Sequence, residues 1–306
     1  MKTFLTAMPQ FEWTGAGLIC RAPAKINLYL KILGRDREGY HLLDSAVAKI
    51  TLYDEIHICP RDDRQVRLSC SGLDCGPVEE NLVLRAVQML QLPAGVEIKL
   101  TKQIPIGAGM GGGSSDAATT LMGLNRLFDL KLTDAEMMKL ASQLGSDVPL
   151  FLDGPSVRIH SRGEIIEPIQ VHLFSVVLIV PAFACSTAEV YAAYDAYEQA
   201  TKDEQASTYQ EISNLLPKLQ QSPDNWRGEL FNDLAIPAMK RYPSLQRVYQ
   251  QVSALSSLPV HLTGSGSGMF IICRDDRQVQ DVASRINQVR EREGDWQLYV
   301  AGNNPW

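Results

Sequence analysis

The segment that decides the fold is Pro105-Ile-Gly-Ala-Gly-Met-Gly-Gly-Gly-Ser-Ser-Asp116, which carries five glycines within seven residues. Glycine tolerates positive φ and lets a ligand approach the main chain, so such a loop can turn several N–H groups toward one anion. An alanine-rich apolar segment follows, and Ser114, Ser115 and Asp116 are predicted to form the cap and first turn of a helix. Because free N–H groups and the macrodipole of a helix N-terminus favour negative charge, the segment predicts a phosphate site.

The identity of the phosphate ligand needs separate arguments. Gly107, Gly109 and Gly112 satisfy G-x-G-x-x-G, but this dinucleotide fingerprint counts only inside a βαβ unit. Residues 96–102 alternate apolar and polar, unlike a parallel strand buried on both faces. Residues 133–136 then form a capping box for another helix, where that unit would place a strand. A Walker loop is excluded because Gly-Lys-Ser/Thr is absent from the sequence. Nucleotide phosphate binding is favoured over a dinucleotide-dependent oxidoreductase and over a glycine-rich surface turn.

Length and composition set the broad class. The chain has 306 residues, enough for two domains, and its 45% hydrophobic and 21% charged residues are typical of a globular enzyme. A net charge of −6 argues against general nucleic-acid affinity. The sequence has no apolar run of the ~20 residues that a membrane span needs, and its start does not resemble a secretory signal. We therefore expect a small-molecule enzyme without nucleic-acid or membrane partners.

The cysteines and histidines give no metal-ligand pattern. The six cysteines, at positions 20, 59, 70, 75, 185 and 273, lack Cys-x-x-Cys spacing, and the five histidines are dispersed. This favours free thiols in a reducing cytoplasm and no protein-bound zinc. Cys70 and Cys75 are close enough in sequence to bridge a turn, which the sequence alone leaves open.

Hydrophobic periodicity predicts an α+β protein. From Leu18 to Leu33 apolar residues alternate with polar ones, which places Lys25, Asn27 and Tyr29 on the polar face of a strand. A second strand is predicted over 47–58, with a bulge or turn at residues 54–55. Helices are predicted over 82–90 and 133–144, and residues 147–151 as the start of an apolar strand. Residues 1–16 are expected to be a loosely held extension.

A break near residue 170 separates two predicted domains, 17–169 and 170–306. In the second domain the predicted order of elements is β-α…β-β-α-β, which suits a ferredoxin-like module. A central strand is predicted over 174–180, a helix is expected to begin at Asn232-Asp233, and residues 200–227 are expected to include a marginal helix.

Three further sequence features can meet the glycine loop. Lys25 offers a cation, Asp147 a carboxylate beside an apolar run, and Thr263–Gly268 a second glycine cluster. Each also has an ordinary alternative, namely a surface lysine, a turn aspartate and a tight strand connection. Phosphoryl transfer requires donors around the phosphates, positive charge and a carboxylate that accepts a proton, usually with a divalent ion on the nucleotide. The residues alone therefore favour a kinase whose acceptor is unknown.

Three motifs resemble those of the GHMP small-molecule kinase superfamily. Residues 105–116 resemble its second motif, residues 22–30 with Gly39-Tyr-His41 its first, and residues 261–268 its third. The resemblance covers roughly residues 18–300. It implies a ribosomal-protein-S5-like N-terminal domain, a ferredoxin-like C-terminal domain, and ATP, with Mg²⁺, beside the substrate in the cleft between them.

Within the superfamily, residues 145–149 and 231–234, together with the first motif, are most similar to members that act in non-mevalonate isoprenoid synthesis. The resemblance implies transfer of the ATP γ-phosphoryl group to the 2-hydroxyl of a cytidine diphosphate-linked methylerythritol. Homoserine and mevalonate kinases are the alternatives, and Gly39-Tyr-His41 argues against both. The oligomeric state is expected to be a monomer or a homodimer.

The resemblance also assigns roles to residues. It implies that Asp147 takes the proton from the acceptor hydroxyl, while Lys25 orients Asp147 and offsets negative charge. It implies substrate contacts at Asn27, Tyr40, His41, Thr187 and Tyr191. Tyr40 and Tyr191 would hold the pyrimidine between two aromatic faces, although Tyr191 can equally pack within its own domain. The implied ATP-binding residues are Pro105, Ile106, Gly107, Ala108, Gly109, Met110, Gly111, Gly112, Gly113, Ser114 and Ser115.

Overall fold

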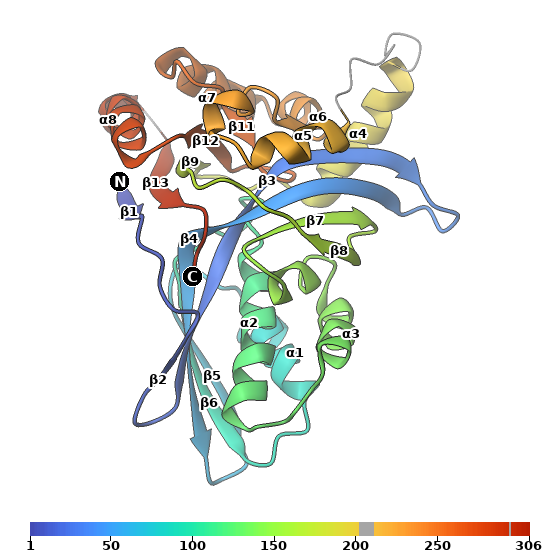
Figure 1. Ribbon diagram of the computed structural model, residues 1–306, viewed down its shortest axis with the longest axis vertical. Coiled ribbons are helices and arrows are strands. Elements are labelled where there is room, and N and C mark those ends of the chain that lie inside the picture. Colours follow the sequence, from blue (N-terminus) through green and yellow to red (C-terminus); the bar gives the residue numbers. More distant parts are fainter. Residues whose placement is uncertain (202–210, 294) are drawn as a thin grey trace.

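The computed structural model describes residues 1–201, 211–293 and 295–306, which form two β-sheets with helices packed against them (Figure 1). The strand order of the first sheet is β10-β3-β4-β6-β5, with β2 beside β3, β7 beside β4, and β8 beside β7. Its strands are β2 (Phe11–Trp13), β3 (Leu18–Arg35), β4 (His41–Arg61), β5 (Val66–Gly72), β6 (Gly95–Lys102), β7 (Ser156–Ser161), β8 (Ile165–Pro168) and β10 (Phe231–Asn232). The second sheet consists of β1 (Lys2–Phe4), β13 (Trp296–Gly302), β9 (Ser175–Pro181), β12 (Met269–Cys273) and β11 (His261–Leu262), in that order.

The helices divide between the two sheets. Helices α1 (Leu82–Gln88), α2 (Gly112–Leu127) and α3 (Asp134–Leu144) cover the first sheet, and their apolar faces form one core with β3, β4 and β6. Against the second sheet lie α4 (Thr187–Thr201), α6 (Ala235–Arg241), α7 (Pro243–Leu255) and α8 (Asp276–Glu293), while α5 (Ile212–Leu219) packs in the core between the sheets. Part of the segment predicted to hold a marginal helix, residues 202–210, lies outside the described residues.

The second sheet confirms the expected α+β class. In the order β13-β9-β12-β11 each neighbouring pair is antiparallel, and α4 and α8 make the two crossovers, as in a ferredoxin-like module. The predicted strand over 174–180 is β9, which lies in the middle of the sheet and is buried throughout. The boundary at residues 169 and 170 remains a prediction, since β1 joins the second sheet and β10 joins the first.

The long strands β3 and β4 connect the two halves. They pair antiparallel over most of their length, with irregularities after Pro23, Asn27 and Ile32 (Figure 1). The irregularity after Asn27 interrupts the alternation predicted for this strand, so that Tyr29, expected on the polar face, is buried. Residues of both strands then pack against β9, β12 and β13 in a core that lies between the sheets. The site described below lies where the halves share this core.

Several local predictions were wrong. Residues 1–16 are held, because β1 pairs with β13 and β2 pairs with β3. No turn forms at residues 54–55, since β4 continues to Arg61. Asp147 is followed by the 3₁₀-helix η2 (Pro149–Leu152) rather than a strand, because Pro149 sits at the first helical position. Asn232 ends β10, and α6 begins three residues later.

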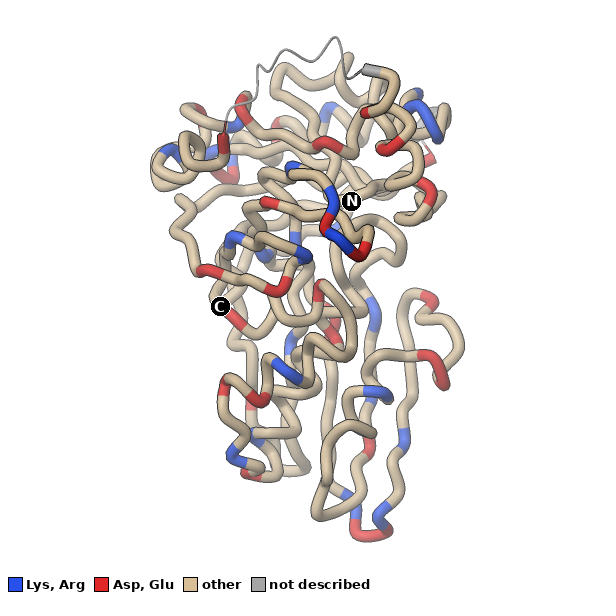
Figure 2. Tube along the Cα trace, turned by 90° about the vertical axis from the view of Figure 1, so that its right-hand side faces the viewer, with Lys and Arg blue, Asp and Glu red and all other residues tan. Residues whose placement is uncertain are grey.

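The βαβ alternative is excluded by the topology. β6, the strand before the glycine loop, pairs antiparallel with β4 and parallel with β5, and α2 is followed by α3. No dinucleotide-binding unit surrounds the loop. Figure 2 shows acidic and basic residues interspersed along the trace. Within the described ranges, none of the helices is both long and apolar enough to cross a membrane.

Candidate active site

The glycine-rich loop is held by its own carbonyl oxygens. Those of residues 107–110 each accept a hydrogen bond from β3 or from the second glycine cluster. The bonds run from Ser267 N to Gly107 O (3.3 Å), Gly268 N to Ala108 O (3.2 Å), Thr263 Oγ1 to Gly109 O (3.3 Å) and Lys25 N to Met110 O (3.0 Å). Because these carbonyl oxygens already accept hydrogen bonds within the protein, the main-chain groups of the loop that remain for a ligand are its N–H donors. The second glycine cluster thus meets the first, as predicted.

Two glycines are required by close packing. A Cβ at Gly109, where φ is +70°, would lie 2.2 Å from the carbonyl oxygen of Thr263. At Gly111, where φ is +69°, a Cβ would lie 2.9 Å from the ring of Phe151. Gly111 is also the N-cap of α2, so the helix begins at Gly112, and the predicted cap by Ser114 was wrong. The left-handed backbone places the free N–H groups of the first turn beside the loop, where an anion is favoured.

Lys25 is buried, contrary to the surface alternative. Its ammonium donates a hydrogen bond to Oδ1 of Asn27 at 2.6 Å, and the Asn27 amide donates to Oγ of Ser45 at 3.0 Å. Burial lowers the pKa of Lys25, and the negative charge of Asp147 acts in the opposite direction. Lys25 is therefore a desolvated amine with a neutral hydrogen-bond partner and a carboxylate acting on it through space.

Asp147 projects from the turn between α3 and η2. The capping box of Thr133 and Glu136 that begins α3 forms as predicted, and Gly145 ends the helix in an extended conformation. The N–H of Val148 donates to Gly145 O at 3.2 Å, which closes the turn around Asp147. The Asp147 carboxylate also acts on Tyr191. Burial, and to a lesser extent the negative charge of Asp147, raise the pKa of the Tyr191 phenol to about 12.

A cavity of about 480 Å³ joins these groups. The predicted site residues that line it are Lys25, Asn27, residues 105–114, Asp147, Thr187 and Tyr191. Ser115 does not line the cavity: it is fully buried inside α2 with no partner for its hydroxyl. On the far wall the hydroxyl of Thr187 lies 2.9 Å from that of Ser265, in the second glycine cluster. The two sheets thus contribute to one site.

The aromatic residues of the expected substrate site are arranged differently from the prediction. Tyr40 is 59% exposed, with the guanidinium of Arg162 4.6 Å from its ring centroid. His41 packs against Tyr191 with the ring centroids 4.8 Å apart, while its Nε2 lies 2.8 Å from Oδ1 of Asp195. Tyr40 and His41 lie outside the cavity lining. The residue facing Tyr191 is therefore His41, because His41 begins β4 whereas Tyr40 belongs to the exposed turn before it.

Asp195 was missed by sequence reasoning. Its carboxylate contacts His41 and also accepts a hydrogen bond from Arg35, so it links the turn between β3 and β4 to α4. Asp195 lies 154 residues from His41 in the sequence, so no local pattern joins them. The sequence feature that could have indicated Asp195 is its spacing on α4: it follows Tyr191 by four residues and therefore lies on the same helix face.

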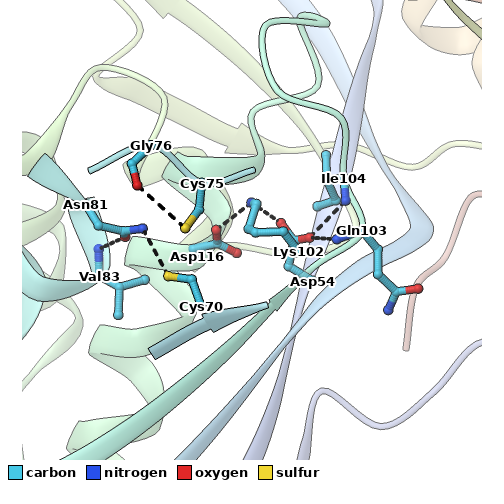
Figure 3. Close-up of polar contacts among 10 residues, drawn as sticks. All are labelled: Asp54, Cys70, Cys75, Gly76, Asn81, Val83, Lys102, Gln103, Ile104 and Asp116. Carbon is cyan, nitrogen blue, oxygen red and sulfur yellow. Dashed lines mark hydrogen bonds and ion pairs between the residues drawn. The ribbon is translucent and has the colours of Figure 1, made fainter. Parts of the chain in front are cut away.

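A second group missed by sequence reasoning is a buried ion cluster on the cavity wall (Figure 3). Lys102 donates hydrogen bonds to Asp54 and, at 2.7 Å, to Asp116. Asp54 also accepts from the main-chain N–H groups of Gln103 and Ile104, at 2.5 and 2.8 Å. Burial disfavours the ammonium of Lys102, but Asp116 and Asp54 outweigh this and raise its pKa. The cluster fixes the end of β6 against β4 and α2, and Lys102 and Asp116 line the cavity.

Comparisons with known proteins agree with this arrangement. The family model for the GHMP kinases N terminal domain matches residues 81–155, and that for GHMP kinases C terminal matches residues 205–291. The 4-diphosphocytidyl-2-C-methyl-D-erythritol kinase of Neisseria meningitidis serogroup B is 34% identical over 274 residues, covering 88% of this chain and 91% of that protein. The enzyme of the same name from Syntrophus aciditrophicus is 34% identical, with 91% and 96% covered.

Solved structures give the same result. A crystal structure of 4-(cytidine 5'-diphospho)-2C-methyl-D-erythritol kinase superposes with a TM-score of 0.76 at 29% identity, covering 94% of this chain and 99% of that one. A homoserine kinase from Cytophaga hutchinsonii, at 15% identity and a TM-score of 0.67 (98% and 96% covered), shares the fold alone. The chain therefore belongs to the 4-diphosphocytidyl-2-C-methyl-D-erythritol kinase family, within the GHMP kinases.

Proposed function

We propose that this chain transfers the γ-phosphoryl group of ATP to the 2-hydroxyl of 4-diphosphocytidyl-2-C-methyl-D-erythritol. The observation that carries the proposal is that Lys25, Asp147 and the glycine loop line one cavity. Membership of the kinase family supports the same activity, and the relatives' names supply the acceptor.

The glycine loop binds the phosphates in this mechanism. The loop residues and the N-terminus of α2 line the cavity with no acid in the loop itself, and the engaged carbonyls hold the loop in place. Fixed donors of this kind stabilise charge that develops on the phosphoryl oxygens without having to reorganise during the reaction. Thr263 and Lys25 support phosphate binding indirectly. Each donates a hydrogen bond to one carbonyl oxygen of the glycine loop and so fixes the loop's position.

Asp147 and Lys25 act on the acceptor. The Asp147 carboxylate accepts the proton of the attacking hydroxyl, and the Lys25 ammonium offsets the negative charge that passes to the oxygen. The hydrogen bond to Asn27 fixes the direction of the Lys25 side chain. Because Lys25 is buried, its interactions with charged groups are stronger than they would be in water.

Mg²⁺ fits this site as a companion of the nucleotide. Among the described residues there is no group of three or more His, Cys, Asp or Glu side chains placed to hold a metal. The ion would therefore be held mainly by phosphate oxygens and water, with Asp147 as a nearby carboxylate, which suits the preference of Mg²⁺ for retained water. When bound, it would supply positive charge that neutralises the phosphates. A cytoplasmic location and a monomeric or homodimeric state remain predictions.

The acceptor is tested by comparing turnover on cytidylylated methylerythritol, homoserine and mevalonate, each with ATP and Mg²⁺. We expect product only from the first, identified by mass as one added phosphoryl group. Phosphorylation of only the latter two would overturn the proposed acceptor while leaving the kinase chemistry intact. Tight NAD binding without ATP binding would overturn both.

A further inference from the structure

Two cysteines lie together at the edge of the cavity, outside the groups used for phosphoryl transfer. Cys70 is on β5, and Cys75 is in the loop that follows it. The Cys70 thiol interacts with Cys75, whose own thiol donates a hydrogen bond to Gly76 O at 3.8 Å, and Figure 3 shows both sulfur atoms near the Asn81 side chain. Both are free thiols; Gly72 lies between them and Gly76 directly follows Cys75, and both glycines have positive φ. Since the two cysteines interact and are five residues apart in the chain, a movement of this loop can bring the sulfurs to bonding distance.

This pair is connected to the cavity wall. Cys75 lines the cavity together with Asn81 and Lys102. The Asn81 amide donates to Cys70 Sγ at 4.0 Å, and its carbonyl oxygen accepts from the N–H of Val83 at 2.9 Å, which caps α1. A change at either sulfur therefore acts on a wall residue.

The wall near Cys75 faces the nucleotide rather than the acceptor. Asp147, Thr187 and Tyr191 occupy the part of the cavity assigned to the acceptor. In-line transfer places the leaving group, and with it the nucleoside, away from the attacking hydroxyl. Cys75, Asn81 and Lys102 are among the other lining residues, and we place the nucleoside on their side of the cavity. This step rests on the proposed function.

We infer that Cys70 and Cys75 are a redox modification site, at which a low-molecular-weight disulfide such as glutathione disulfide forms an intramolecular disulfide that weakens ATP binding. The Cys75 thiolate attacks the glutathione disulfide, forming a mixed disulfide and releasing one glutathione. Cys70 then loses its proton and attacks Sγ of Cys75, releasing the second glutathione. In total, two protein thiols are oxidised and one glutathione disulfide is reduced to two glutathione molecules.

The order of attack follows from burial. Burial, together with the hydrogen bond that the Cys70 thiol donates to Cys75, raises the pKa of Cys70 to about 12, so Cys70 reacts second. Cys20, Cys185 and Cys273 are buried among apolar side chains and are poor targets. Cys59, on β4, is half-buried and provides a matched control.

The site is tested on the full chain with glutathione disulfide, in the absence of ATP. Remaining thiols are alkylated, and peptides are mapped by mass. We expect a linkage between Cys70 and Cys75 that lacks two hydrogen atoms relative to the reduced pair and disappears on reduction. Cys59→Ser should retain this linkage, and Cys70→Ser should lose it. Absence of the linkage under conditions that fully oxidise a dithiol reference peptide would overturn the site.

The effect on the nucleotide is measured by direct ATP binding to the oxidised and reduced protein. We expect the Kd for ATP to rise by about fivefold or more on oxidation of the wild-type chain and of Cys59→Ser, with no oxidation-dependent change in Cys70→Ser. An unchanged Kd in the fully linked protein would overturn the effect on ATP binding. Because the linkage is read by mass, a failure of the proposed kinase activity would not be mistaken for a failure of this site.

Discussion

Two buried lysines of the same cavity differ in their partners. Lys102 lies between two carboxylates, those of Asp54 and Asp116. Lys25 is buried to the same degree, but its hydrogen-bond partner is the neutral amide of Asn27, and Asp147 acts on it through space. The pKa of Lys102 is raised and that of Lys25 is lowered, although burial opposes the charge of both.

This difference indicates a structural role for Lys102 and a role in phosphoryl transfer for Lys25. A lysine held by two carboxylates fixes strands and a helix, and its charge is already balanced. A desolvated lysine with a neutral partner keeps its charge available for a ligand that brings negative groups of its own. We therefore expect Lys25 variants to affect turnover and Lys102 variants to affect stability.

The largest expected effect is that of Asp147→Asn. The amide cannot accept the hydroxyl proton, so kcat should fall by at least about 100-fold while ATP affinity changes little. Steady-state kinetics and direct ATP titration measure the two quantities. Asp281→Asn, an exposed substitution on α8, is the control and should leave both unchanged. A wild-type kcat in Asp147→Asn would remove Asp147 from the mechanism.

Lys25→Met should also abolish most turnover, with kcat reduced by about 100-fold, because positive charge at the transferred group is lost. The Met side chain fills the same space, and the removal of a desolvated amine costs no ion pair. The free energy of unfolding should therefore stay the same or increase, which urea denaturation would measure. A variant that loses activity only because it unfolds would contradict the comparison.

Lys102→Met should have the opposite profile. It leaves Asp54 and Asp116 buried without a cation, so the free energy of unfolding should fall by about 3–5 kcal/mol. Urea denaturation measures the loss. Lys99→Met, at an exposed position of the same strand, should change it by less than about 0.5 kcal/mol. Equal stability of the two variants would show that the cluster does not support the wall.

Asp195→Asn tests the link between the halves. The substituted amide would keep one hydrogen bond but lose the charge that holds His41 and Arg35. We expect KM for the acceptor to rise by about fivefold with kcat nearly unchanged, as for a residue that positions a binding group. A lower kcat at unchanged KM would place Asp195 in the chemical step instead.

A third buried lysine gives a pH dependence of the free energy of unfolding. Burial lowers the pKa of Lys49 from 10.5 to about 7. Because the folded chain then binds this proton more weakly than the unfolded chain, its contribution to the free energy of unfolding rises with pH between about 7 and about 10, by up to about 1.4 kcal/mol per pH unit. Lys49→Met should remove this contribution. Parallel slopes for Lys49→Met and wild type in urea denaturation would contradict it.

The sequence predicted features whose cause is local. The capping box at Thr133, the buried strand β9 and the glycine loop each follow from a few adjacent residues. The motifs also brought Lys25 and Asp147 to one site, because each belongs to a recognisable pattern. The capping box and the buried strand were predicted correctly, and Lys25 and Asp147 do line one cavity, while their catalytic roles stay predictions.

Features that depend on distant partners were missed. Lys102 meets Asp54 across 48 residues of sequence, and neither stands out in its own strand. The pairing of β1 with β13 joins the two ends of the described chain through three residues each, too few for a periodic signal. The irregularity after Asn27 moved Tyr29 into the core because the partner strand, and not the local pattern, sets the register.

The central claim is that the Asp147 carboxylate and the glycine loop act on the same pair of reacting atoms. A crystal structure with a non-hydrolysable ATP analogue and 4-diphosphocytidyl-2-C-methyl-D-erythritol measures this most directly. We predict the γ-phosphate against the N–H groups of residues 107–115 and the acceptor 2-hydroxyl within hydrogen-bond distance, about 2.6–3.2 Å, of Asp147. An acceptor hydroxyl turned away from Asp147, with the phosphates bound elsewhere in the cavity, would contradict the account.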